Sequence, residues 1–290
     1  MNYLLFYKGK LPDYYSLCIN SILSVDTEAK IIFCGDHEVR NSNIDFLHIN
    51  DITSNETHEI INLEVYEGTT YSEKENPLWL NSLLRVFYLR DVASELSLDQ
   101  FIHFDLDVII YKSFENINHI FDPKKLNITE HIEDTPIFGY SYFPKLEIIN
   151  KLCSDLKDYL LYENIKNKEL PNFRPLNEME LLSIVKEKND HLFNSLPILP
   201  YGNQEFIFDP ATYGQYFGGL PANSNSLFKR RHISLSHIAG KEISSKRIKP
   251  IFKNSPKVLY SNKEIDIVNL HIHSKQLSKF LPENYKNVIV

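Results

Sequence analysis

The chain has 290 residues, of which 43% are hydrophobic and 24% are charged. These are ordinary values for a globular protein and exclude disorder as the dominant state. The formal net charge of −7 argues against nucleic-acid binding, and no stretch approaches the roughly 18 consecutive apolar residues of a membrane helix.

The first segments predict a βαβ unit. Residues 3–7 form a short apolar run, residues 14–23 have a helical pattern, and residues 30–34 form a second apolar run before Gly35. Strand, helix and strand in so short a space imply a parallel sheet with helices on its faces. We therefore expect an α/β protein.

Cysteine usage and the N-terminus favour a cytoplasmic protein. Cys18, Cys34 and Cys153 are widely spaced and lack metal-ligand spacing, so we expect reduced thiols in the core. The first eight residues lack the basic segment and long apolar stretch of a signal peptide.

A helix is predicted from Leu78 to Val92, with Asn76 as N-cap and Pro77 in the first turn. Asn81 and Arg85 are four residues apart and share one face of this helix. They either meet water or lie over a site formed by the segment that follows.

That segment, Gln100 to Ile110, reads as a buried strand that contains Asp105 and Asp107. Side chains two positions apart in a strand point to the same face, so the two carboxylates should converge. A buried carboxylate needs a partner, and a divalent cation bridging a diphosphate is a natural one. The alternative is a strand that runs out into a loop with solvated acids.

The next segments are expected to be structural. Residues 136–140 predict a strand and residues 145–164 a long amphipathic helix. Asn177 and Glu180 have the spacing of a capping pair for a helix through Lys186.

Four of the nine glycines fall between Gly202 and Gly219, in a stretch that also contains Glu205 and Asp209. Glycines among amides, acids and aromatics are typical of a loop that approaches a ligand closely, or of a tight structural turn.

Residues 265–275 predict a late strand in which alternation places Asn269, His271 and His273 on one face, followed by Lys275. Two imidazoles in phase would complement carboxylates in a Mn²⁺ site, whereas a single histidine is usually a core or surface group.

Between Lys229 and Lys257, nine basic residues stand against one acid, Glu242. This window carries +8 and the remainder of the chain −15. Such a patch suits nucleotide phosphates, a lipid-linked acceptor or peripheral contact with an anionic membrane, and it is equally compatible with a solvated surface.

Three features follow one another along the chain: the Asn81/Arg85 helix, Asp105-Leu106-Asp107 and the late His271-Ile272-His273-Ser274-Lys275 strand. A chain with these features in this order resembles the nucleotide-sugar-dependent glycosyltransferases of the GT-A fold. The resemblance implies one catalytic domain over residues 1–290, with a Rossmann-like, mostly parallel sheet and a smaller appended acceptor-side lobe. About residues 1–125 would bind the nucleotide and about 126–290 the acceptor.

The resemblance also implies the roles of individual residues. Asp105, Asp107 and His271, with His273 as the competing choice, would hold Mn²⁺ or Mg²⁺. Arg85 and Asn81 would contact the donor, Tyr7 and Lys8 would cradle its base, and Lys275 would face the diphosphate. The donor would be a nucleoside-diphosphate sugar, with UDP as the family's usual nucleotide, and the acceptor a saccharide or lipid-linked glycan.

The stereochemistry stays open, because many retaining relatives carry an aspartate where this chain has Asn81-Ser82. An inverting reaction needs a carboxylate base, for which Asp209 and Glu205 are the candidates. Two other readings are a catalytically silent sugar- or nucleotide-binding protein and an Asp-x-Asp phosphohydrolase. The latter should carry its acids near the N-terminus and lead into a Gly-Thr turn, whereas here Val108 and Ile109 continue the apolar run after the acids.

Overall fold

A computed structural model describes residues 1–39, 41–63, 66–67, 72, 74, 77–169, 176–220 and 233–285, with only the backbone of 163–169. The predicted N-cap Asn76 and the basic residues Lys229, Arg230 and Arg231 lie outside the described residues.

The centre of the molecule is a seven-stranded sheet in the order β3-β2-β1-β4-β7-β6-β8. The first four neighbours run parallel, β7 runs antiparallel to β4 and β6, and β8 is again parallel to β6. The order 3-2-1-4 is that of a doubly wound sheet, so the predicted α/β class with a mostly parallel sheet is confirmed. The strands are β1 (Asn2–Tyr7), β2 (Lys30–Gly35), β3 (Ile44–His48), β4 (Phe101–His103), β6 (Leu126–Ile132), β7 (Thr135–Phe143) and β8 (Phe193–Ser195).

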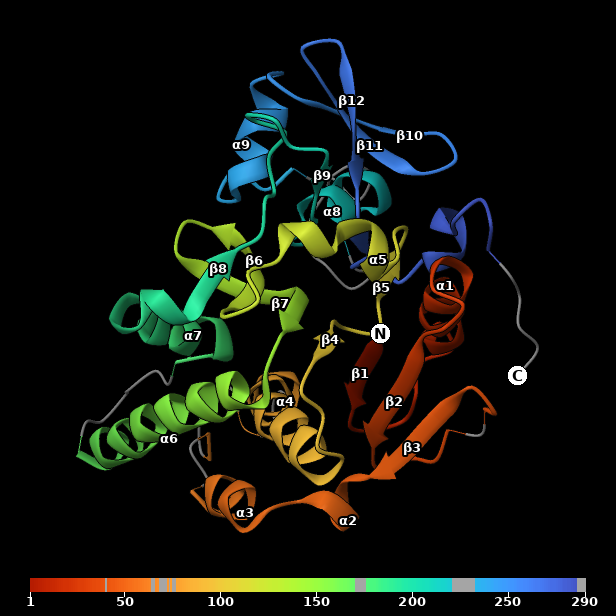
Figure 1. Cartoon of the computed structure of the whole chain (residues 1–290). Coiled ribbons are helices and arrows are strands. Elements are labelled where there is room, and N and C mark those ends of the chain that lie inside the picture. The colour runs from red at the N-terminus through yellow and green to blue at the C-terminus, as the bar shows by residue number, and fades with distance from the viewer. Residues whose placement is uncertain are drawn as a thin grey trace.

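Helices cover both faces of this sheet (Figure 1). Alternate residues of β1 enter different cores: Tyr3 and Leu5 pack on the side of α1, and Leu4 and Phe6 pack on the side of α4, α6 and α7. A strand buried on both faces explains the continuous apolar run seen at residues 3–6. These helices are α1 (Tyr15–Val25), α4 (Pro77–Glu95), α6 (Leu146–Glu169) and α7 (Glu178–Lys188).

A second sheet with the order β10-β11-β12-β9 forms a smaller lobe. It lies at the end of the molecule opposite the short helices α2 and α3 (Figure 1). Its elements are β9 (Phe206–Ile207), β10 (Lys249–Phe252), β11 (Pro256–Tyr260) and β12 (Lys263–Ile267), accompanied by α8 (Thr212–Gly218) and α9 (Ile238–Ser244).

A two-stranded sheet joins the middle of the chain to its C-terminal part: β5 (Val108–Ile110) pairs antiparallel with β13 (Asn269–His271). The remaining short helices are α2 (Ile49–Ile52), α3 (Asn55–Asn62), α5 (Phe114–Ile117) and the 3₁₀ turns η1 (Asn118–Ile120), η2 (Asp190–Leu192) and η3 (Leu277–Phe280).

Two predicted strands are interrupted. The strand predicted from Gln100 to Ile110 is wrong as a single element: β4 ends at His103, a turn follows, and β5 begins at Val108 in another sheet. The amide of Val108 donates to the carbonyl of Asp105 at 3.1 Å, so the two aspartates lie in the turn. The strand predicted over 265–275 is likewise broken at Val268, whose amide donates to the carbonyl oxygen of Ile207 in β9, and it ends at His271, after which the chain turns.

Candidate metal and donor site

The two aspartates meet the end of β13 where the short sheet opens. Asp105 and Asp107 lie in the turn between β4 and β5, and His271 is the last residue of β13, opposite Val108. The Nε2 atom of His271 lies 3.1 Å from Asp107 Oδ1 and 3.8 Å from Asp105 Oδ2. The carboxylates therefore converge on one imidazole, although a turn and not a pleated strand brings them together.

His273 completes a cluster of three candidate metal ligands. One ligand atom from each of Asp107, His271 and His273 lies within 4.8 Å of the others, and the two imidazole rings meet edge-on with centroids 4.5 Å apart. A carboxylate oxygen with two imidazole nitrogens is a donor set that suits Mn²⁺ and similar divalent ions. The described residues of this cluster thus fit a divalent cation.

The protonation of these groups also suits a metal. Burial would raise the pKa of Asp107, but His271 and Lys275 lower it well below its usual range. Burial and the neighbouring His271 lower the pKa of His273 to about 3, so that ring is neutral at pH 7. Burial would also lower the pKa of His271, yet the attraction of Asp107 and Asp105 raises it overall. A cation would replace the proton that His271 shares with Asp107.

Gln215 of α8 orients His273. The Nε2 atom of Gln215 lies 2.9 Å from His273 Nδ1, and the side chain of Gln215 is buried. A ligating imidazole commonly holds its second nitrogen in such a hydrogen bond. In this orientation the amide of Gln215 donates to Nδ1; rotating the carboxamide by half a turn brings its oxygen to Nδ1–H and leaves the lone pair of Nε2 for an ion.

Lys275 and Tyr14 border the cluster. The ammonium group of Lys275 pairs with Asp107 and lies 5.7 Å from the ring centre of Tyr14. Burial and the charge of Asp107 raise the pKa of Tyr14, so its hydroxyl stays protonated. The side chain of Lys275 is 45% exposed and has room to turn from Asp107 toward an anionic ligand.

Arg85 connects Asp105 to a third element. Its guanidinium contacts the carboxylate of Asp105, lies 2.9 Å from Glu178 Oε1 at the start of α7, and stacks 5.1 Å from the ring centre of Phe138. Arg85 and Glu178 are both buried. Because a buried charge is costly unless paired, Asp105, Arg85 and Glu178 hold one another in place.

Several buried polar atoms of the site lack a hydrogen-bond partner among the described residues. They include Oδ1 of Asn81, Nε of Arg85 and Nδ1 of His271. Asn81 stands one helical turn before Arg85 on α4. Buried polar groups are normally paired, so these atoms are suited to a ligand or to ordered water.

Tyr7 and Lys8 lie at the C-terminal edge of the sheet, where open α/β sheets bind ligands. Beside them, the amide of Gly9 donates to Asp36 Oδ1 at 2.8 Å, which joins the ends of β1 and β2. A Cβ at Gly35 would stand 2.7 Å from the carbonyl oxygen of Tyr7, so only glycine allows this close packing.

The surroundings of Asp209 differ from those expected of a general base. Its carboxylate is fully buried and accepts four backbone hydrogen bonds of 2.7–3.0 Å, from Ala211, Tyr213, Gly214 and His271. Burial raises the pKa of Asp209. With its oxygens engaged by amides, this carboxylate ties the start of α8 to β13, and the structure does not favour it as a base for an acceptor hydroxyl.

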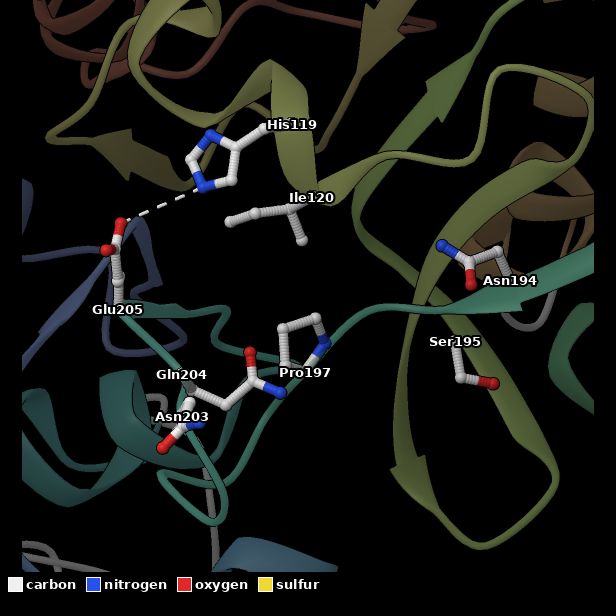
Figure 2. A pocket seen from close by; sticks show the side chains of 8 residues that line it. All are labelled: His119, Ile120, Asn194, Ser195, Pro197, Asn203, Gln204 and Glu205. Atoms are coloured by element: carbon white, nitrogen blue, oxygen red, sulfur yellow. Dashed lines mark ion pairs between the residues drawn. The ribbon is translucent and has the colours of Figure 1, made fainter.

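Glu205, the other candidate base, is not among the contacts of the metal cluster. It is exposed and lies 3.8 Å from Nε2 of His119, in an open groove beside the lobe (Figure 2).

Three residues of the site were not predicted from the sequence: Tyr14, Glu178 and Gln215. Tyr14 follows the C-terminal end of β1, a position that would have pointed to it. Gln215 belongs to the Gly-rich stretch but carried no distinguishing pattern. Glu178 stands inside the predicted capping pair of Asn177 and Glu180, which is confirmed, and an acid in a first helical turn is unremarkable.

Within the predicted basic stretch, some of the described residues form ion pairs with acids. Arg247 pairs with Glu242, Lys253 with Glu264, and Lys257 with Glu264 and Asp266. Among the described residues, no helix combines the length and the apolar character that crossing a bilayer requires.

Comparison with models of protein families and with curated proteins finds no match. Among solved structures, the chain is similar to apo mouse xyloside xylosyltransferase 1, with a TM-score of 0.45 and 13% identity over 68% of this chain and 86% of that chain. It is also similar to the apo form of the glycosyltransferase GlyE of Streptococcus pneumoniae TIGR4, with a TM-score of 0.43 and 12% identity.

The GlyE alignment covers 75% of this chain and 48% of GlyE, so the chain spans about half of that protein. A third similar structure is the PaToxG glycosyltransferase, with a TM-score of 0.43 and 11% identity over 65% of this chain and 69% of that chain. We therefore build the functional proposal on the residues of this chain.

Proposed function

We propose that the protein is a metal-dependent glycosyltransferase that moves a sugar from a nucleoside-diphosphate sugar, in the first place a UDP-sugar, to a saccharide or lipid-linked acceptor. The observation that carries the proposal is the meeting of Asp105, Asp107, His271 and His273, which come from two distant segments of the chain.

The metal-binding part consists of Asp107, His271 and His273, with Asp105 beside them. A bound Mn²⁺ or Mg²⁺ would neutralise the negative charge that develops on the leaving diphosphate. Lys275 would support the same chemistry: its ammonium group, which pairs with Asp107, would pair with a phosphate oxygen if a cation took its place at Asp107. A second positive charge at this point stabilises the separated leaving group.

The donor-binding part consists of Arg85, Asn81, Tyr7 and Lys8. The unpaired Oδ1 of Asn81 and Nε of Arg85 are buried, so they would supply one acceptor and one donor to the sugar through an ordered water. Tyr7 and Lys8 would hold the base and ribose at the carboxyl edge of β1. Glu178 keeps Arg85 oriented, so the donor meets a preorganised guanidinium.

Release of nucleoside diphosphate tests the proposal. Wild-type protein, incubated with UDP-sugars and Mn²⁺, should release UDP slowly by hydrolysis and faster with a suitable acceptor, and chelation should stop both. Asp107→Asn should lower the rate about 100-fold, because it removes a charged metal ligand while keeping the shape of the side chain.

Two other outcomes would replace the proposal. Metal-dependent hydrolysis of p-nitrophenyl phosphate without sugar-nucleotide turnover would identify a phosphohydrolase. Calorimetric binding of UDP with Mn²⁺, without turnover of any sugar nucleotide, would identify a silent binding protein. Calorimetry against a panel of nucleoside diphosphates would also identify the base.

Membrane contact through the basic stretch 229–257 remains a prediction of the same proposal. It expects cosedimentation with vesicles of anionic lipid that falls as salt is raised. Equal binding to neutral vesicles would contradict it.

A further inference from the structure

An open groove lies outside the metal and donor site, between the central sheet and the lobe. Its volume is about 600 Å³. Figure 2 shows the His119/Glu205 pair at one end and Asn194 with Ser195 at the other. Its polar lining comes from η1, β8 and the loop before β9, as His119, Asn194, Ser195, Asn203, Gln204 and Glu205.

The chemistry of this lining selects a neutral polar ligand. Three carboxamides and a hydroxyl offer both donors and acceptors. The only acid, Glu205, faces His119 at 3.8 Å, and no lysine or arginine lines the described groove. An anionic ligand would lack a cationic partner here, and an apolar one would cover unpaired amides.

The groove also has a small apolar surface. Ile120 and Pro197 lie in its wall, and the ring of His119 lies 6.3 Å from that of Phe206 at the start of β9. Ligand sites commonly combine apolar walls with a few polar groups. A pyranose ring, which has C–H faces and a rim of hydroxyls, matches both surfaces.

Part of the lining is fixed and part is unengaged. Asn194 Nδ2 donates to Asn127 Oδ1 at 2.7 Å, and the hydroxyl of Ser195 donates to Glu130. The carboxamides of Asn203 and Gln204 make no hydrogen bond with any described residue. The fixed pair sets an anchor point, and the unengaged pair can meet a ligand's hydroxyls.

The groove is connected to the metal site by one continuous segment. Glu205 precedes Asp209 by four residues, about 13 Å of extended chain. Between them β9 pairs with β12, and Asp209 accepts the amide of His271. The groove and the cluster therefore lie within the length of a ligand of several linked units.

We infer that this groove binds a neutral saccharide segment of the acceptor, at a distance from the sugar being transferred. The inference rests on the proposed function and specifies its acceptor as an uncharged oligosaccharide chain.

An array of immobilised oligosaccharides, neutral and uronic-acid-containing, tests this inference with the full chain. Wild-type protein should bind neutral members, and the double variant Asn203→Ala/Gln204→Ala should bind them about tenfold less because two sets of hydrogen bonds are lost. Asn150→Ala, which removes an exposed carboxamide from α6, is the matched control and should bind as wild type does. Thermal melts verify that the variants are folded.

Performing the array in EDTA separates this inference from the proposed function, because the groove contains none of the proposed metal ligands. Binding in EDTA together with failure to turn over any sugar nucleotide would retain the groove and reject the transferase. Sugar-nucleotide turnover without neutral-glycan binding, binding only to acidic glycans, or full binding by the double variant would overturn the inference.

Discussion

The carboxylate of Asp107 has two partners that can carry a positive charge. His271 and Lys275 contact its two oxygens, and both partners come from the C-terminal part of the chain. An unpaired buried carboxylate would cost several kcal/mol, on the order typical of a broken buried pair. These contacts stabilise the carboxylate, and a bound cation would take the place of the Lys275 ammonium group and of the proton between His271 and Asp107.

Gln215 gives the first prediction at this scale. Gln215→Leu should weaken Mn²⁺ binding about 10- to 100-fold, because the ring of His273 loses the hydrogen bond that orients it. Gln215→Glu retains an acceptor for Nδ1–H and should bind at least as well as wild type. Titration calorimetry with MnCl₂ measures both, and wild-type affinity in the leucine variant would remove Gln215 from the site.

Glu178 gives the second prediction. Glu178→Gln keeps the shape of the side chain but removes one of the two carboxylates around Arg85, so donor turnover should fall about tenfold, the loss expected for a weakened positioning bond. Glu178→Ala should also reduce the free energy of unfolding by about 3–5 kcal/mol, the cost of breaking a buried pair.

Glu187→Gln, an exposed acid of the same helix, is the control for both measurements. Steady-state kinetics and urea denaturation distinguish the effects on rate and stability. Full activity in Glu178→Gln would show that Asp105 needs no support from α7.

At the scale of elements, Asp209 connects α8 to β13 through hydrogen bonds. Ala211, which precedes the helix, has a φ of 106°, and Asp209 accepts the amides of Ala211, Tyr213 and Gly214 around this strained residue. A Cβ at Gly214 would lie 2.0 Å from the carbonyl oxygen of His271, so the helix can approach β13 only through glycine. The same connection positions Gln215 against His273.

The backbone hydrogen bonds that Asp209 accepts predict that Asp209→Asn is destabilising. The amide nitrogen of asparagine would face backbone N–H groups, so the free energy of unfolding should fall by about 2–3 kcal/mol. Asp158→Asn on the exposed face of α6 is the control. A variant of Asp209 with wild-type stability and no transfer activity would instead support the base role that the sequence suggested.

Element patterns predicted the sheet better than the site. The apolar runs at 3–7 and 30–34 and the capping pair Asn177/Glu180 are local features, and all three are confirmed. The break after His103 was not predictable in this way, because apolar residues continue on both sides of the aspartates while the chain passes from one sheet to another.

Contacts between distant segments limit how much of the site can be predicted from the sequence. Glu178 meets Arg85, and Asp209 meets the amide of His271, only after several elements have packed. Local periodicity carries no information on such pairs. By contrast, His271 and His273 were found from a local alternation, although β13 ends at His271 and His273 lies in the turn that follows.

At the scale of the whole molecule, β5 and β13 connect the central sheet to the lobe, and the candidate metal cluster lies at their end. His131 of β6 marks another contact between the two: its ring meets that of His237, beside α9, at 5.1 Å and 88°. Nδ1 of His131 is buried without a partner among the described residues.

His131 predicts how stability depends on pH. Burial lowers its pKa below the ordinary 6.5, so between these two values the unfolded chain binds a proton that the folded protein does not. Its contribution therefore reduces stability as pH falls below 6.5, by up to about 1.4 kcal/mol per pH unit. His131→Phe keeps an aromatic ring and removes this term, so the variant should gain stability relative to wild type between pH 7 and pH 5. Urea denaturation at pH 7, 6 and 5 measures the difference, and parallel curves for the two proteins would show that His131 takes up its proton equally in the folded and unfolded states.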